Sequence, residues 1–228
     1  MQSKPDNYYD LVVADPPLGK REDGRQKRAH WLDDKGRRYF IKDGGYTAKS
    51  WDETLPAMQY FKELFRISRH QIIWGIPCLP FNPGQGRIVW DKVNGTSDQY
   101  DCEIAYCSLN NRTELISYQW KGMMQGKSIC QPKIQEGNKR LNEKRLHPTH
   151  KPVALHAMVF ERYQIPWHWK IFDPNLGSGS LGIACLALGY QLDGCENDSE
   201  YFDLATSWLA EEGRQLKQST TAKLFCEK

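Results

Sequence analysis

Residues 172–182 read FDPNLGSGSLG, and this stretch decides the fold class. An apolar run ends at Asp173, and three glycines follow at the spacing G-x-G-x-x-G, namely Gly177, Gly179 and Gly182. An apolar segment of helical length comes next. Glycines let the backbone approach a ligand closely, and the N-terminus of the following helix offers unpaired N–H groups. The stretch therefore predicts a strand, a cofactor-binding loop and a helix within an α/β fold.

Expected strands alternate with expected helices on both sides of this loop. β-Branched and aromatic runs bounded by Gly, Asn and Ser predict strands at 11–14, 71–75, 86–92, 102–108, 115–121, 169–174 and 190–196. Apolar residues at helical spacing predict helices after a cap at Asp52, at 151–163, at 179–189 and from 198 or 199 to about 217. This alternation predicts a Rossmann-like, doubly wound and mostly parallel sheet. Residues 121–151 are expected to form a loop.

An acid, Glu196, ends the next expected strand, 19 residues after Gly177. An acid at that position binds the hydroxyls of a ribose, so the site fits a nicotinamide dinucleotide as well as S-adenosylmethionine. Two observations favour S-adenosylmethionine. Only 46 residues follow Gly182, which is fewer than the further βα units of a dinucleotide domain require. In addition, the carboxylate of Asp173 would repel a pyrophosphate, whereas it suits a cationic sulfonium amino acid.

The length and the charge of the chain narrow its class. The chain has 228 residues, and we expect it to form one domain over 1–228, with insertions at about 19–50 and 121–146. The net charge is only +3, but residues 20–42 hold nine Lys or Arg against four acids, and residues 133–151 hold six against two. Basic loops that also contain aromatic residues suit contacts with the phosphates and bases of nucleic acids. We therefore expect both insertions to face DNA.

The sequence also argues against several other classes. Neither the N-terminus nor any internal stretch has the pattern of a signal peptide or of a membrane span, so we expect a cytoplasmic protein. The seven cysteines form no CxxC pair, and no histidine lies beside them at zinc spacing. We therefore expect no metal site.

Three motifs together resemble one known family. DPPL at 15–18, HPTHKP at 147–152 and FDPNLGSGS at 172–180 are similar to motifs of the amino-group DNA methyltransferases, which modify adenine N6 or cytosine N4. Their order resembles the permuted members, in which the catalytic motif precedes the cofactor motif, and the sequence looks closest to small phage-type or prophage-type adenine enzymes. The resemblance implies a circularly permuted S-adenosylmethionine-dependent methyltransferase fold and DNA as the partner. It also implies a role in DNA methylation, such as restriction–modification, and pairing as a homodimer.

The resemblance assigns the catalytic step to Asp15, Pro16, Pro17 and Leu18. The exocyclic amine of adenine is a poor nucleophile, because its lone pair is delocalised into the ring. In the family, the acid (here Asp15) and the next carbonyl (here that of Pro16) accept the two N–H bonds, and the prolines stiffen the turn. The amine then attacks the sulfonium methyl group in line, without a metal. Asp rather than Ser at this position implies adenine rather than cytosine.

The fourth residue of the motif departs from the family pattern. An aromatic side chain normally stacks on the base that has been flipped out of the duplex, and Leu18 has no ring. We expect a substitute ring from Trp31, Tyr39, Phe40, Tyr46 or Trp51. Two alternatives stay open. One is a nucleic-acid-binding partner subunit with impaired catalysis, which Leu18 favours; the other is an NAD-dependent oxidoreductase, which the short C-terminal remainder disfavours.

The remaining motif residues are assigned to the cofactor and to DNA. The resemblance implies that the cofactor is held by Asp173, Pro174, Gly177, Ser178, Gly179, Glu196, His147, Thr149 and Lys151. The basic segment after the catalytic motif is predicted to bind DNA through Lys20, Arg21, Arg25, Lys27, Arg28, Trp31, Arg37, Arg38 and Tyr39.

Overall fold

The structure, a computed structural model, describes residues 1–22, 31–32, 38–39, 49–95 and 100–218. Its centre is a seven-stranded sheet with the order β11-β10-β1-β4-β6-β5-β7. The strands are β1 (Tyr9–Ala14), β4 (Ser68–Trp74), β5 (Arg87–Asp91), β6 (Cys102–Cys107), β7 (Thr113–Ser117), β10 (Lys170–Asp173) and β11 (Gln191–Gly194). Every pairing in this sheet is parallel except the two made by β6, which runs against the other six strands. The predicted α/β fold with a mostly parallel sheet is confirmed.

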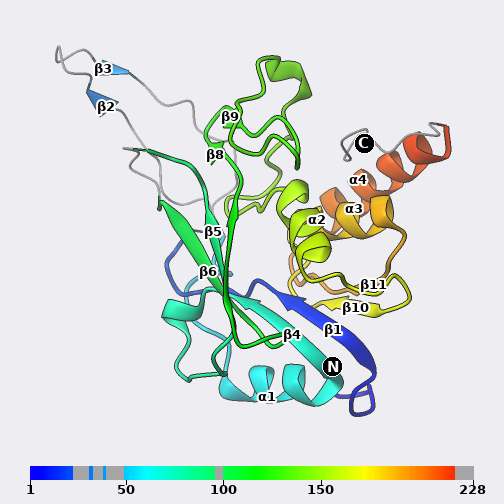
Figure 1. Cartoon of the computed structure of the whole chain (residues 1–228). Coiled ribbons are helices and arrows are strands. Elements are labelled where there is room, and N and C mark those ends of the chain that lie inside the picture. The colour runs from blue at the N-terminus through cyan, green and yellow to red at the C-terminus, as the bar shows by residue number, and fades with distance from the viewer. Residues whose placement is uncertain (23–30, 33–37, 40–48, 96–99, 219–228) are drawn as a thin grey trace.

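Helices cover both faces of the sheet, as Figure 1 shows. They are α1 (Met58–Ile67), α2 (Val153–Arg162), α3 (Ser180–Leu188) and α4 (Ser199–Gln218), with short 3-10 helices η1 (Ile76–Cys78) and η2 (Lys139–Leu141). Side chains alternate along β1, so Leu11 and Val13 join the core under α2 and α3, while Val12 and Ala14 join the core under α1. The predicted doubly wound arrangement is therefore present. No helix in the described part of the chain is long and apolar enough to cross a membrane.

Two short hairpins lie outside the seven-stranded sheet. β2 (Trp31–Leu32) pairs with β3 (Arg38–Tyr39), and β8 (Trp120–Lys121) pairs with β9 (Met124–Gln125), both antiparallel. The single strand expected over 115–121 is wrong: it divides into β7 and β8, because the N–H of Gln119 bonds to the carbonyl of Pro132 instead of continuing the ladder. Residues 23–30, 33–37, 40–48, 96–99 and 219–228 lie outside the described residues.

The topology brings distant motifs to one edge of the sheet. The parallel strands β1, β4 and β10 end at Ala14, Trp74 and Asp173, and all three ends lie at the same edge. Because β6 runs in the opposite direction, its first residues, Cys102 and Glu103, lie at this edge as well. The carboxyl edge of a parallel sheet is the usual place for a ligand in such folds.

Candidate active site

A cavity of about 450 Å³ opens at this edge and collects most of the predicted site residues. Those that line it are Asp15, Pro16, Pro17, Leu18, Lys20, His147, Thr149, Lys151, Asp173, Gly177, Ser178 and Glu196. The structure therefore brings the DPPL, HPTHKP and glycine-loop motifs together, although they lie far apart in the sequence. A volume of this size is typical of small-molecule sites.

The other predicted site residues do not line the cavity or are not described. Pro174, Gly179 and Arg21 are absent from the lining. Trp31, Arg38 and Tyr39 belong to β2 and β3, whose side chains are not described, and Arg25, Lys27, Arg28 and Arg37 lie outside the described residues, as do Phe40 and Tyr46. The assignment of these residues stays a prediction.

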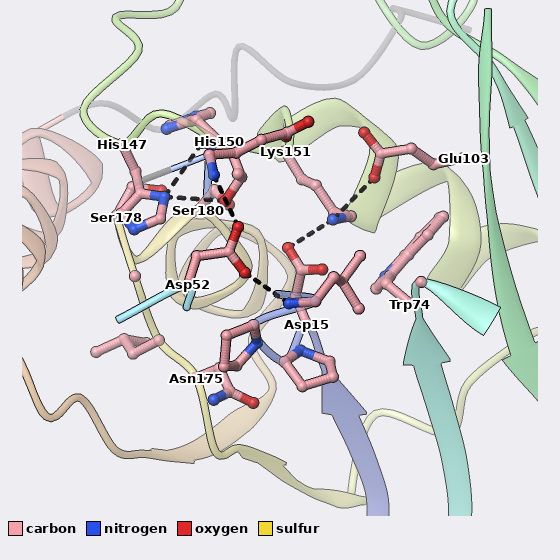
Figure 2. A pocket seen from close by; sticks show the side chains of 18 of the residues that line it. Asp15, Asp52, Trp74, Glu103, His147, His150, Lys151, Asn175, Ser178 and Ser180 are labelled. Atoms are coloured by element: carbon pink, nitrogen blue, oxygen red, sulfur yellow. Dashed lines mark hydrogen bonds and ion pairs between the residues drawn. The ribbon is translucent and has the colours of Figure 1, made fainter. Parts of the chain in front are cut away.

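A chain of alternating charges occupies the end of the cavity that contains Asp15 (Figure 2). The Lys151 ammonium lies 2.5 Å from Oδ2 of Asp15 and 3.0 Å from Oε2 of Glu103. Glu103 is bound in turn by Lys92, 2.6 Å from its Oε1. The Lys151 side chain is only 5% exposed, and its ammonium lies 5.1 Å from the centre of the Trp74 ring. Lys151 was assigned to the cofactor, but its contacts bind it to the predicted catalytic acid.

Burial and charge together set the protonation of these groups. Burial raises the pKa of Asp15 above its ordinary value, and the Lys151 ammonium opposes this rise. Burial acts in the same direction on Glu103, but Lys151 and Lys92 outweigh it and lower the pKa of Glu103 to about 2. Burial disfavours the charge on Lys151, yet its two carboxylate partners raise the pKa of Lys151. At neutral pH, Lys151 is therefore a cation that fixes one oxygen of Asp15.

The turn after Asp15 is held by Asp52, a residue that was expected to cap a helix. That expectation is wrong: α1 begins six residues later, after Ala57, without a side-chain cap. Asp52 is 3% exposed and accepts hydrogen bonds from the backbone N–H groups of Leu18 at 2.7 Å and Gly19 at 2.9 Å through Oδ1. Its Oδ2 accepts a third from Glu22 at 2.8 Å. Asp52 thus shapes the chain that leaves the DPPL motif.

We expect Asp52→Ala to loosen this turn. Three backbone N–H groups in part-buried hydrogen bonds would lose their acceptor, and an intramolecular hydrogen bond typically contributes about 0.5–1.5 kcal/mol. Hydrogen exchange of the amides of Leu18, Gly19 and Glu22 should therefore accelerate, and the midpoint of chemical unfolding should fall. Asp52→Asn, which keeps one acceptor oxygen, should give a smaller change. Unchanged exchange at all three amides in Asp52→Ala would contradict this role.

Leu18 packs against Gly75, the residue that follows β4. Gly75 has φ +80°, and a Cβ added to it would lie 2.4 Å from Cδ2 of Leu18. The positive φ favours glycine at this position, and any other residue would also displace the end of the Leu18 side chain. The expected strand at 71–75 is correct as far as Trp74, and the glycine that follows it contacts Leu18 of the DPPL motif.

The three glycines of the other motif have different roles. Gly177, at φ +52°, lines the cavity and donates its N–H to Oε2 of Glu196 at 2.7 Å. Gly179, at φ +84°, faces α4 instead, where an added Cβ would lie 3.0 Å from Cβ of Ala205. A Cβ on Gly182 would likewise meet the side chain of Leu209 at 3.0 Å. One glycine thus opens the cavity, and the other two allow the close approach of α4.

Asp173 is a buried carboxylate that lines the cavity where β10 ends, just before the glycine loop. It is 5% exposed, and one of its oxygens accepts the N–H of Asn175 at 3.0 Å. Among the described residues, no basic side chain forms an ion pair with it. Burial therefore raises its pKa to about 7, and the nearby carboxylates of Asp15 and Glu196 add to the rise. A buried carboxylate that forms no ion pair with a described basic side chain favours a cationic ligand.

Aromatic residues form the wall beside the glycine loop. The His147 ring contacts two aromatic rings, those of Trp51, at 4.8 Å between centroids, and of Tyr201 in α4, at 4.3 Å. Burial lowers the pKa of His147 to about 3, so it is neutral at physiological pH, and its Nδ1 lies 3.1 Å from the Thr149 hydroxyl. Lys49 binds Asp198 at 3.0 Å and Glu200 at 2.7 Å across the start of α4. These contacts tie the segment before Asp52 to the wall of the cavity.

The second predicted insertion is attached to the HPTHKP motif. Glu143 lies 2.6 Å from Nε2 of His150 and accepts the N–H of Val153 at 3.1 Å. The Arg145 guanidinium lies 4.4 Å from the centre of the Trp120 ring, which stacks on His150. The segment 121–146 is thus fixed at its end to residues that line the cavity. The described residues contain no group of three or more His, Cys, Asp or Glu placed to hold a metal ion.

Sequence reasoning missed several residues that line or support the cavity. Glu103, Tyr100, Asn175 and His156 line it, and Tyr60 of α1 hydrogen-bonds to Asn175. An acid at the start of an otherwise apolar strand was a usable signal for Glu103, whereas Tyr100 stands in a polar loop without a motif. The positions of Glu103 and Tyr100 follow from the reversed direction of β6, which no local sequence pattern predicts.

The fold and the cavity define a class, an α/β protein that binds a small molecule at the carboxyl edge of its sheet. Comparison with known sequences makes the class specific. The chain belongs to the DNA methylase family of N6 and N4 methyltransferases, whose model matches residues 89–207. The match includes the HPTHKP and glycine motifs but not DPPL at 15–18. The resemblance to the amino-group DNA methyltransferases is therefore confirmed.

Individual relatives are more distant. The chain is 23% identical over 237 residues to the Type II methyltransferase M.HinfI of Haemophilus influenzae, covering 92% of this chain and 66% of that protein. Among solved structures, the M1.HpyAVI–SAM complex has a TM-score of 0.49 at 18% identity, with 89% of each chain covered. The PvuII DNA methyltransferase, described as cytosine-N4-specific, has a TM-score of 0.46 at 10% identity, with 95% of this chain and 88% of that chain covered.

Proposed function

We propose that this protein transfers the methyl group of S-adenosylmethionine to the N6 amine of adenine in DNA. One observation carries the proposal: Asp15, fixed by Lys151, shares a single cavity with the buried carboxylate of Asp173 and the glycine loop. An acceptor for an amine and a site for a cationic cofactor are therefore neighbours. The family match supports methyl transfer and argues against an NAD-dependent oxidoreductase.

The residues present fit S-adenosylmethionine. Asp173 provides a negative charge, without a described basic partner, for the cationic amino acid part of the ligand. Gly177 leaves the cavity open beside His147. After accepting three backbone N–H groups, the carboxylate of Glu196 has about one lone-pair site left, on Oε2, for a hydroxyl of the ribose. When bound, the cofactor supplies an electrophilic methyl group on a positively charged sulfur.

The chain itself supplies orientation and acceptors. Lys151 holds Oδ2 of Asp15, so Oδ1 is available to accept one N–H of the target amine, while the carbonyl of Pro16 accepts the other. Drawing both hydrogens toward acceptors localises the nitrogen lone pair, which is otherwise delocalised into the ring. Positioning and electrostatics then account for catalysis, and a covalent enzyme intermediate is not required.

The choice of adenine rests on the resemblance. In the family, Asp at the first position of the motif accompanies adenine and Ser accompanies cytosine, and this chain has Asp15. The basic segments at 20–42 and 133–151 are proposed to bind the DNA backbone while the base is extruded. Single-domain organisation, a homodimer, a cytoplasmic location and a phage or restriction–modification context belong to the same proposal and rest on the sequence and the resemblance.

A labelling experiment tests the proposal. The protein is incubated with methyl-labelled S-adenosylmethionine and unmethylated DNA, and the DNA is digested to identify the labelled nucleoside. Label in N6-methyladenine is the expected result. Label in N4-methylcytosine would contradict the choice of base. Cofactor binding without any transfer would favour the alternative that Leu18 raises, a nucleic-acid-binding partner subunit with impaired catalysis.

The pKa of Asp173 predicts how cofactor affinity depends on pH. The ionised carboxylate attracts the cationic ligand, and this carboxylate becomes protonated as the pH falls through about 7. Below that pH, the affinity for S-adenosylmethionine should fall by up to about tenfold per pH unit. Calorimetric titration from pH 6 to pH 8 measures the effect, and Asp173→Asn should remove it. The same pH dependence in both proteins would contradict this role of Asp173.

A further inference from the structure

The catalytic motif has no ring to stack on a flipped base, and the cavity offers a replacement. This inference rests on the proposed function, because a base leaves its stacked neighbours only if it is drawn out of the duplex. Four Trp and Tyr side chains line the cavity in the described part of the chain, namely Trp51, Trp74, Tyr100 and Tyr201. Their surroundings differ enough to select one of them.

Two of the other three rings are buried, and the third packs against a histidine ring. Trp74 is 1% exposed and lies beneath the Lys151 ammonium. Tyr201 is 3% exposed and packs against His147. Trp51 also packs against His147, whose ring lies beside Gly177 of the glycine loop. None of the three therefore presents an open face beside Asp15.

Tyr100 has the exposure and the position that the other rings lack. It is 58% exposed, and it lies two residues before the start of β6, where Cys102 and Glu103 line the same cavity. Through Glu103 and Lys151 this strand is connected to Asp15, which lines the same cavity as Tyr100. The ring also lies 4.7 Å from the ammonium of Lys20, two residues after Leu18.

The backbone that carries Tyr100 is anchored, although its ring is exposed. The Tyr100 carbonyl accepts a hydrogen bond from Nδ2 of Asn94 at 2.8 Å. The next carbonyl, that of Asp101, accepts the N–H of Lys92 at 2.9 Å, and Lys92 also binds Glu103. An exposed ring on a fixed backbone loses little conformational freedom on contact with a base, since tyrosine has only two side-chain torsions.

We propose that Tyr100 supplies the aromatic face on which the flipped base stacks, in place of the ring that Leu18 cannot provide. Stacking of a base on an aromatic side chain does not depend on the position of the residue in the sequence, only on a reachable open face. Lys20, beside the ring, is then placed to meet a neighbouring phosphate.

A double-mutant cycle tests this assignment. The variants are Tyr100→Leu, Leu18→Tyr and the two combined, with kcat/KM for methyl transfer to unmethylated DNA as the readout. Tyr100→Leu should lower kcat/KM by about tenfold to a hundredfold, while the affinity for S-adenosylmethionine stays the same. Tyr100→Phe keeps the ring and should keep the rate. Leu18→Tyr should raise the rate or tighten DNA binding, and in its background the loss of Tyr100 should cost little.

Trp167→Ala is the matched control. Trp167 is 75% exposed but lies between α2 and β10, away from the residues that line the cavity, so its loss should not change transfer. If the wild type transfers label and Tyr100→Leu is equally active, the inference is wrong and the proposed function stands. An equal loss in both backgrounds would also overturn it, because a stacking role requires the two rings to substitute for each other. If the wild type transfers no label, the proposed function fails first and the inference falls with it.

Discussion

Asp15→Ala should lower the rate of methyl transfer by about 10²–10³-fold and leave cofactor binding intact. The variant removes the charged acceptor for the amine, and the loss of one preorganised group of this kind costs on the order of 10²–10³ in turnover. Because the Asp15 carboxylate contributes to the raised pKa of Asp173, its removal should if anything strengthen binding of S-adenosylmethionine. Transfer is measured with labelled cofactor and DNA, and binding by calorimetry.

In the same experiment, Asp15→Asn tests whether transfer depends on the negative charge of the Asp15 side chain or only on its shape. The amide is close in size to the carboxylate, but it offers a single acceptor oxygen, and its NH2 group cannot accept the amine N–H. Lys151 keeps Glu103 as a partner at 3.0 Å in both variants, so the fold should survive. If Asp15→Ala retained wild-type turnover, another group would have to activate the amine, and the site described above would be wrong.

Lys151→Met should lower activity in a pH-dependent way. Lys151 opposes the rise in the pKa of Asp15 that burial causes, so its removal raises this pKa further. Since the carboxylate form accepts the amine, kcat/KM falls as the pH drops through the pKa of Asp15. The acidic limb of the pH profile should therefore move to higher pH, with about a tenfold loss per pH unit on that limb.

Other groups act on the same carboxylate and supply the controls. Glu103 raises the pKa of Asp15 and Lys92 lowers it, while Asp173 and the Tyr60 hydroxyl lie close enough to interact with it. Lys92→Met, which removes a cation that contacts Glu103 rather than Asp15, should shift the profile less than Lys151→Met. Partial recovery of the Lys151→Met variant at high pH supports the electrostatic role. An equal loss at every pH would indicate that Lys151 serves only to maintain the shape of the cavity.

The sequence predicted those parts of the fold that local patterns determine. The apolar run at 11–14 and the glycine spacing after Asp173 each have a local physical cause, and the strand and the loop formed where expected. The helix that contains Phe61 also formed, but it begins at Met58 and not directly after Asp52. The motif resemblance then identified the three segments that meet at the cavity. The family and the glycine loop could therefore be identified from the sequence alone.

The missed features all depend on long-range contacts. Asp52 was assigned to a helix cap because Asp often has that role, but its acceptors are used by backbone N–H groups about thirty residues earlier. Glu103 and Tyr100 reach the cavity only because β6 runs against its neighbours. Lys151 was assigned to the cofactor from its motif, whereas its partner at 2.5 Å is Asp15. Such pairings arise from the topology of the sheet, and sequence spacing does not contain them.

The most direct test of the central claim is a structure of the protein with a cofactor analogue and unmethylated DNA that contains its target sequence. The account predicts an extruded adenine in the cavity, with its N6 at hydrogen-bonding distance, about 2.7–3.2 Å, from the oxygen of Asp15 that Lys151 leaves unbound. The analogue should lie between Asp173 and the glycine loop. Two results would contradict this expectation. One is an adenine that remains stacked in the duplex, and the other is an extruded adenine whose N6 contacts other groups and not Asp15.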